Sequence, residues 1–240
     1  MGIRLRKIRM NDMNNDIIKL DALDRQEALR YLGMGKTEPD DNTQRLLDEC
    51  EKLLLEAARP QYVYRCFECI HREEGVEAAG TNLILTGNSI KEHLKGCDRM
   101  VLLCATISAE VDRLLRKLEL KDMAAMVVAD SLSSVAVEQV CSKAEQIIAD
   151  KFEGTYQTWR FGIGYGDLPL TLQPDFLRIL DAGKRVGVYA TKSCLLTPRK
   201  SVTCIIGVSD KPLPKSQRGC QTCNMKGKCP YSGTDIGCGR

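Results

Sequence analysis

The stretch RFGIGYGD, residues 160–167, places three glycines on alternate positions beside one arginine, one tyrosine and one aspartate. It superficially matches the glycine-rich turn of nucleotide-binding Rossmann folds, which requires a strand before the turn and a helix after it. Here a long predicted helix lies upstream, and the segment that follows, DLPLTLQP, has prolines where a helix would have to continue. The stretch therefore argues against a Rossmann site. Two other interpretations remain: tight turns, or a ligand laid along extended backbone.

Predicted helices and strands follow one another irregularly around this stretch. Cap residues and apolar spacing indicate helices at 24–33, 46–58, 88–96, 108–152 (two helices) and 175–183. Apolar and β-branched runs indicate strands at 61–71, 99–106, 185–191 and 202–209, with a loop through Pro198 before the last. We expect Asp24 to cap the first helix, Ser89 and Glu92 to form a capping box, and Gly183 to end the last helix. The order lacks the alternation of a doubly wound sheet, so the sequence predicts an α+β fold.

The composition is that of an ordinary globular protein, with 43% hydrophobic and 28% charged residues in 240. No apolar run reaches the about 20 residues of a membrane span, and the basic N-terminus lacks the apolar segment of a secretory signal. We therefore expect a cytoplasmic protein that does not enter a membrane. The net charge of +3 is too small to indicate a nucleic-acid partner.

The residue types in 160–167 suit one kind of ligand. Glycines let backbone groups approach a flat ligand closely, an arginine can bind a carboxylate through two hydrogen bonds, and a tyrosine can cover an aromatic ring or a cation. S-adenosylmethionine combines a carboxylate, a cationic centre and an aromatic base. The candidate binding residues are Arg160, Gly162, Gly164 and Tyr165.

At these residues the chain resembles the family of the reactivation domain of cobalamin-dependent methionine synthase, including its stand-alone relatives. The family's ligand-binding signature, Arg, three residues, Gly, Tyr, stands here as Arg160, Gly164 and Tyr165. A second similar segment comprises Thr191, Ser193, Pro198, Ser201 and Val202. The resemblance implies an α+β body over residues 1–210, with a mainly antiparallel twisted sheet flanked by helices, and a loop-rich tail over 211–240.

The resemblance also implies a function: binding S-adenosylmethionine and supporting the reductive methylation, or reactivation, of a corrinoid. The chain would then be a methyltransferase component, and Glu138 and Glu153 are candidates for binding the ribose. The corrinoid-binding pattern Asp, x, His, x, x, Gly fails at residues 91–96, where lysine replaces aspartate. The cobalamin is therefore expected on a separate corrinoid protein or methionine synthase subunit, with an electron donor such as flavodoxin or ferredoxin. Methyl transfer needs no acid–base pair, so His71 and His93 are expected to be ordinary strand or surface residues.

The last part of the chain carries a cysteine motif, CQTCNMKGKCPYSGTDIGC, with the candidate metal ligands Cys220, Cys223, Cys229 and Cys238. This spacing fits either a structural zinc ion or an iron–sulfur cluster, and plain reduced thiols remain a third interpretation. Residues 211–240 also hold six Lys or Arg and one Asp, typical of a solvated basic tail or of a docking segment for an acidic partner. An alternative function is thus a non-enzymatic iron–sulfur or zinc accessory protein that docks an electron carrier to a corrinoid methyltransferase. Cys66 and Cys69 share the two-residue gap, but a strand would point them to opposite faces.

Overall fold

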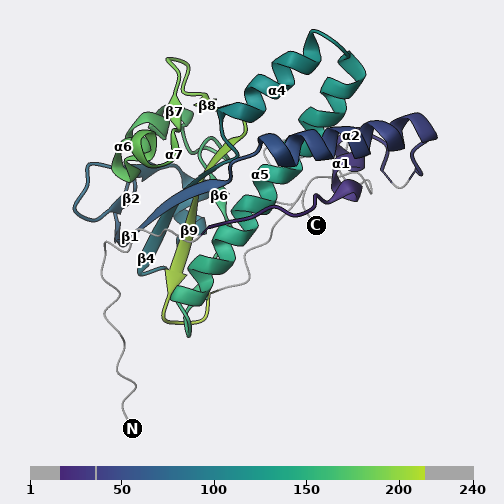
Figure 1. Cartoon of the computed structure of the whole chain (residues 1–240). Helices are drawn as coiled ribbons and strands as arrows, with labels where there is room; N and C mark the ends of the chain where they lie inside the picture. The colour runs from purple at the N-terminus through teal and green to yellow at the C-terminus, as the bar shows by residue number, and fades with distance from the viewer. Residues whose placement is uncertain (1–16, 36, 214–240) are drawn as a thin grey trace.

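A twisted antiparallel sheet organises the fold (Figure 1). In this computed structural model, which describes residues 17–35 and 37–213, the strand order is β3-β2-β1-β4-β9-β5, and β6 also pairs with β9. The strands are β1 Gln61–His71, β2 Gly75–Ala78, β3 Ile84–Thr86, β4 Arg99–Thr106, β5 Tyr156–Gln157, β6 Phe161–Gly162 and β9 Ser201–Ser209. Every pairing in the described residues is antiparallel. The predicted α+β class is confirmed.

The three long strands β1, β4 and β9 form the centre of the sheet. Leu103 of β4 lies opposite Tyr64 of β1 and Cys204 of β9. Seven of the eight β4 residues are buried, because the sheet is covered on both faces. The strands therefore read as continuous apolar runs, without the alternation of a half-exposed sheet.

One face of the sheet is covered by four helices: α1 Arg25–Tyr31, α2 Asp41–Ala57, α4 Ala109–Glu119 and α5 Met123–Lys151. The long helix α5 crosses the sheet and contacts each of the other three (Figure 1). Contrary to the expectation from the sequence, this helix is long and apolar enough to span a membrane. However, 61% of its most apolar 18-residue segment is buried inside the protein. It is packed as the core helix of this layer, with Leu132, Val140 and Ile148 fully buried.

The other face carries the short elements: α3 Asn88–His93, the 3-10 helix Leu170–Leu172, α6 Gln173–Leu180, α7 Ala182–Val186 and the hairpin β7 Tyr189–Ala190 with β8 Leu196–Thr197. Its core includes Phe176 of α6 and Leu102 of β4, both fully inaccessible. The sheet is thus the middle of three layers, and β9 contributes Cys204, Ile206 and Val208 to the core that it shares with α5.

Several local expectations can be compared with these elements. Asp24 does cap α1, accepting a hydrogen bond from the Glu27 amide. The predicted Ser89–Glu92 capping box is wrong: the amides of Asn88 and Ser89 donate to the carboxylate of Asp167 instead. The distant carboxylate satisfies the amides that a local cap would have taken.

The end of α6 and the strand after it also differ from expectation. Helix α6 ends at Asp181, which has left-handed backbone, and Gly183 lies inside α7. A Cβ at Gly183 would lie 2.5 Å from the Tyr189 ring, so this glycine allows close packing and does not end a helix. The strand predicted at 185–191 is reduced to the two residues of β7 because α7 extends to Val186.

The cysteines of β1 behave as expected. Cys66 packs against the core beneath α5, and Cys69 packs against the core on the opposite face of the sheet. Cys220, Cys223, Cys229 and Cys238 lie outside the described residues, so the tail motif stays a prediction.

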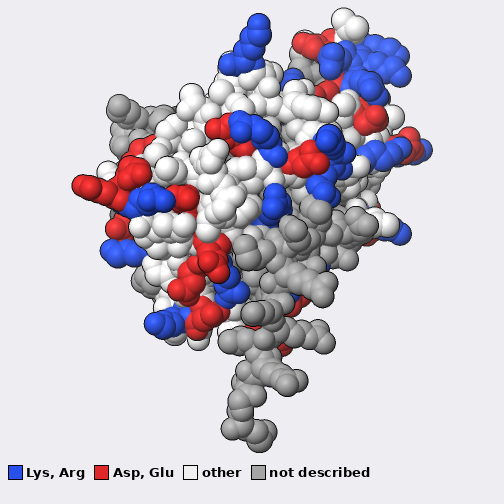
Figure 2. Space-filling model, turned by 90° about the vertical axis from the view of Figure 1, so that its left-hand side faces the viewer, with Lys and Arg blue, Asp and Glu red and all other residues white. Residues whose placement is uncertain are grey.

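Figure 2 shows the face on the side of α6 and β2. Lysine and arginine are interspersed there with aspartate and glutamate around a broad area without any of the four. Among the described residues of this face, charge of one sign does not form a continuous stripe.

Candidate functional site

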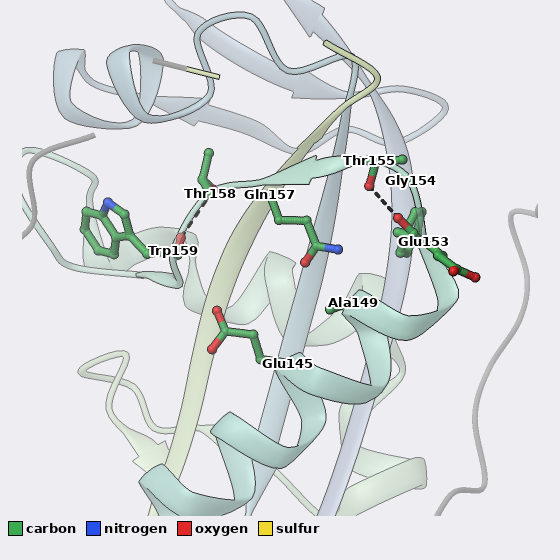
Figure 3. A pocket seen from close by; sticks show the side chains of 9 residues that line it. Glu145, Ala149, Glu153, Gly154, Thr155, Gln157, Thr158 and Trp159 are labelled. Carbon is green, nitrogen blue, oxygen red and sulfur yellow. Dashed lines mark hydrogen bonds between the residues drawn. The ribbon is translucent and has the colours of Figure 1, made fainter. Parts of the chain in front are cut away.

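The segment from Glu153 to Asp167 runs along the outer edge of β9. Its strand β5 pairs with residues 208–209, and β6 pairs with residues 204–205. Between the first part of this segment and the last turns of α5 lies a groove of about 490 Å³ (Figure 3). It is lined by Glu145, Ala149, Phe152, Glu153, Gly154, Thr155, Gln157, Thr158 and Trp159.

Two of the three glycines of the 160–167 stretch have a backbone conformation that favours glycine. Gly164 and Gly166 have φ of 89° and 58°, a left-handed conformation that side chains disfavour. The Tyr165 amide donates to Gly162 O, and the Leu168 amide donates to Tyr165 O, which makes two consecutive turns. A Cβ at Gly162 would lie 3.5 Å from the Tyr165 ring, an ordinary contact distance. Tight turns thus account for Gly164 and Gly166, while Tyr165 remains 59% exposed at the surface.

Arg160 lies over α5 and forms ion pairs with two of its glutamates. Its Nη2 is 3.2 Å from Glu138 Oε2, and its Nε is 3.4 Å from Glu145 Oε2. The arginine side chain is 12% exposed, and Nη1 is buried with no hydrogen-bond partner. The guanidinium is therefore held in place but has an unfilled donor group, which a planar anion could satisfy.

Two buried thiols complete the surroundings of this guanidinium: Cys141 of α5 and Cys204 of β9. Burial raises the pKa of Cys141 to about 12 and raises that of Cys204 well above its ordinary value. Burial acts to lower the pKa of Arg160, but the negative charges that face it outweigh burial, so this pKa is raised; they are the Cys141 and Cys204 thiolates, which form only at high pH, and the two glutamates. At neutral pH the site therefore contains a fixed cation and two neutral thiols.

An aromatic row runs from the glycine turns toward the groove. The Tyr165 ring packs edge-on to Phe161 at 6.1 Å between centroids, and Phe161 lies 5.5 Å from Trp159. His93 packs against both Trp159 and Phe161, and its Nε2 lies 2.8 Å from Thr158 Oγ1. The expectation that His93 is an ordinary strand or surface residue is wrong, because it is buried in helix α3 and fixes this row. His71 does lie on a strand, in contact with the Cys97 carbonyl.

The second segment of the proposed signature lies in the β7–β8 turn and at the start of β9. Thr191 Oγ1 accepts from the Leu195 amide and contacts Ser193 Oγ at 3.0 Å, so these hydroxyls shape the turn. Ser201 donates to Thr106 and joins β9 to β4. These residues do not line the groove; their described contacts are structural.

The structure separates the two acidic candidates of the sequence analysis. Glu138 contacts Arg160, whereas Glu153 lies at the far end of the groove with its carboxylate directed outward (Figure 3). Glu145 and Gln157, which project into the space between α5 and β5 in Figure 3, were not predicted. One signal was available: Glu138 and Glu145 are seven residues apart, which places them on one face of a helix.

Within residues 17–35 and 37–213, groups of three or more metal-ligating side chains are absent. Of the described cysteines, Cys50, Cys97, Cys104, Cys141 and Cys204 are buried, and Cys66, Cys69 and Cys194 are partly exposed. A metal or cluster at the tail cysteines remains a prediction for residues outside this range.

Comparisons with known proteins give a relation of fold. No family model matches the chain, and no curated protein matches it in sequence. A crystal structure of the MetH reactivation domain bound to AdoHcy (S-adenosylhomocysteine) has a similar fold, with a TM-score of 0.59 and 17% identity. The match covers 83% of this chain and 78% of that chain. The α+β architecture with its mainly antiparallel sheet is thus shared with that domain.

Proposed function

We propose that this protein binds S-adenosylmethionine beside Arg160 and supports the reductive methylation of a corrinoid carried by a separate protein. The observation that carries the proposal is the position of Arg160, whose ion-pair partner Glu145 lines an open groove on the sheet edge, in a fold shared with a domain whose structure contains AdoHcy. The candidate contacts are Arg160, the backbone at Gly162 and Gly164, and Tyr165.

The residues present suit the amino-acid end of such a ligand. A carboxylate is the planar acceptor that matches a guanidinium in two-point geometry, and Nε and Nη2 of Arg160 are the atoms that Glu145 and Glu138 now contact. Two glutamates already contact this side chain, so the carboxylate must displace at least part of one ion pair. The Tyr165 ring is 59% exposed, and an aromatic ring of this kind can cover a sulfonium or stack on an adenine.

The reaction would require positioning more than proton transfer. The partner's corrinoid would supply a nucleophilic cobalt, which would accept the methyl group by in-line displacement at the sulfonium and leave S-adenosylhomocysteine. The role of this chain would be to fix the methionine carboxylate at Arg160 and to hold the sulfonium at the protein surface near Tyr165. An electron donor such as flavodoxin or ferredoxin would supply the electron that returns inactive cobalt to its nucleophilic state. The cysteine tail is a candidate for docking that donor or for carrying its electron.

A second function remains in competition: a non-enzymatic accessory protein that uses the tail to dock an electron carrier. The observation that favours it is that Arg160 is already engaged by Glu138 and Glu145 within the chain. Such a protein would not bind S-adenosylmethionine.

Calorimetric titration with AdoHcy, the stable product, distinguishes the two. We expect one ligand per chain for the wild type and at least tenfold weaker binding for Arg160→Gln, because hydrogen bonds to charged groups contribute about 1.5–3 kcal/mol. Arg178→Gln is the matched control, since the Arg178 side chain is 70% exposed and pairs with Asp175 of its own helix. The proposal fails if the folded wild type does not bind, or if Arg160→Gln binds as tightly as the control.

The corrinoid part needs its own assay. Labelled methyl from S-adenosylmethionine should appear on cobalt when this protein, a corrinoid protein and a reductant are combined, and Arg160→Gln should slow its appearance. Equal transfer without this protein would contradict the role.

A further inference from the structure

Glu145 both lines the groove and forms an ion pair with Arg160. Its carboxylate lines the groove, and its Oε2 is 3.4 Å from Arg160 Nε. Its side chain is 31% exposed, so it can be reached from the groove. Figure 3 shows it projecting from α5 into the space that Gln157 enters from β5.

Glu138 provides a contrast on the same helix. It binds the other side of the guanidinium, with Oε2 3.2 Å from Nη2, but it does not line the groove and is 51% exposed. A ligand that enters through the groove and approaches Arg160 therefore meets Glu145 first. To take the Nε side of the guanidinium, its carboxylate must replace Glu145 there.

Replacement has an electrostatic consequence. If the ligand carries only a carboxylate, the displaced Glu145 faces a second anion across the groove without a cation of its own. Desolvated carboxylates in this position are costly unless paired. If the ligand also carries an ammonium group on the carbon next to the carboxylate, that ammonium can pair with Glu145 in place of Arg160. After the exchange Arg160 still has two ion pairs and Glu145 still has one.

We propose that Glu145 is the specificity residue of the groove: it leaves Arg160 when a ligand carboxylate binds and pairs with the α-ammonium of the same ligand. The site would thus select molecules that end in a free zwitterionic α-amino acid. This inference rests on the proposed function and extends it to the chemical class of ligand.

The test compares two ligands that differ only in the ammonium group: AdoHcy and its des-amino analogue, the same thioether with hydrogen in place of the α-amino group. In calorimetric titrations the wild type should prefer AdoHcy by about tenfold or more, the equivalent of 1.4 kcal/mol. In Glu145→Gln this preference should fall to near one. The des-amino analogue should bind Glu145→Gln at least as tightly as wild type, because a competitor for Arg160 has been removed.

Glu138→Gln serves as the matched control, since it removes the other carboxylate on Arg160 but leaves the groove lining intact. It should keep the wild-type preference for AdoHcy. The inference is overturned if Glu145→Gln weakens both ligands by the same factor, as a purely structural role would, or if Glu138→Gln loses the preference equally. A folded wild type that binds neither ligand overturns the proposed function itself. That outcome is distinct from a wild type that binds both ligands equally well, which overturns only the role of Glu145.

Discussion

Replacing Gly166 by alanine should destabilise the protein by about 1–5 kcal/mol. Gly166 has φ of 58°, and left-handed backbone costs a residue with a Cβ about 1–2 kcal/mol. The new Cβ would also lie 2.3 Å from Ser89 Oγ and 2.6 Å from Ser89 Cβ, an overlap of the kind that costs about 1–3 kcal/mol. The lower entropy of the unfolded alanine chain offsets about 0.4–1 kcal/mol of this. Urea denaturation, followed by circular dichroism, measures the difference in unfolding free energy.

Two further variants separate the cost of the left-handed backbone from the cost of the overlap with Ser89. Gly162→Ala is the control within the same stretch, because its Cβ would meet the Tyr165 ring at an ordinary 3.5 Å and its φ is not left-handed; we expect a change below about 1 kcal/mol. Combining Gly166→Ala with Ser89→Gly should relieve the overlap but not the backbone strain, which gives a favourable coupling energy of about 1 kcal/mol or more. If Gly166→Ala unfolds within about 0.5 kcal/mol of wild type, the described packing of this turn on α3 is refuted.

Three other predictions test the fold and the surroundings of the site. Asp167→Asn should lower the unfolding free energy by about 1 kcal/mol at neutral pH, as loss of a helix cap does. Because the two helix amides lower the pKa of Asp167 in the folded state, this difference should persist above the unfolded pKa and disappear as pH falls through the lowered folded value; equal costs at pH 3 and pH 7 in urea titrations would contradict the cap. Cys141 and Cys204, whose pKa values are raised by burial, should react with a thiol reagent at pH 8 only after unfolding, and rapid labelling of either in the native protein, located by mass spectrometry, would place it at the surface. Leu132→Ala in the core of α5 should cost about 3–5 kcal/mol by chemical denaturation, and a cost under 1 kcal/mol would mean that α5 does not pack against the sheet as described.

The features that the sequence predicted well are those set by nearby residues. The cap at Asp24 uses an amide three residues away, and the strand at 61–71 is specified by its own β-forming side chains. The cap of α3 could not be predicted, because its carboxylate, Asp167, is 78 residues from Ser89. The capping-box rule considers only nearby residues, so it assigned the cap of α3 to Ser89. Asp167, which caps this helix, comes close only in the folded protein.

The candidate site divides in the same way. Arg160 and Tyr165 belong to a short motif, so their types and spacing could be read from the chain. The groove could not, since it exists only where β5 and β6 pair with β9 beside α5. Glu145 shares a helix face with Glu138, but nothing in the sequence says which segment crosses that face. Pairing of Phe161 with Ile205 is what brings Arg160 over it.

A crystal structure of the protein grown with AdoHcy would show where and how the ligand binds. We expect the ligand carboxylate on the guanidinium of Arg160, the α-ammonium within hydrogen-bond distance of Glu145, and the thioether beside Tyr165. A ligand bound at another surface, or a groove without ligand at a concentration that saturates the protein in titration, would contradict this expectation.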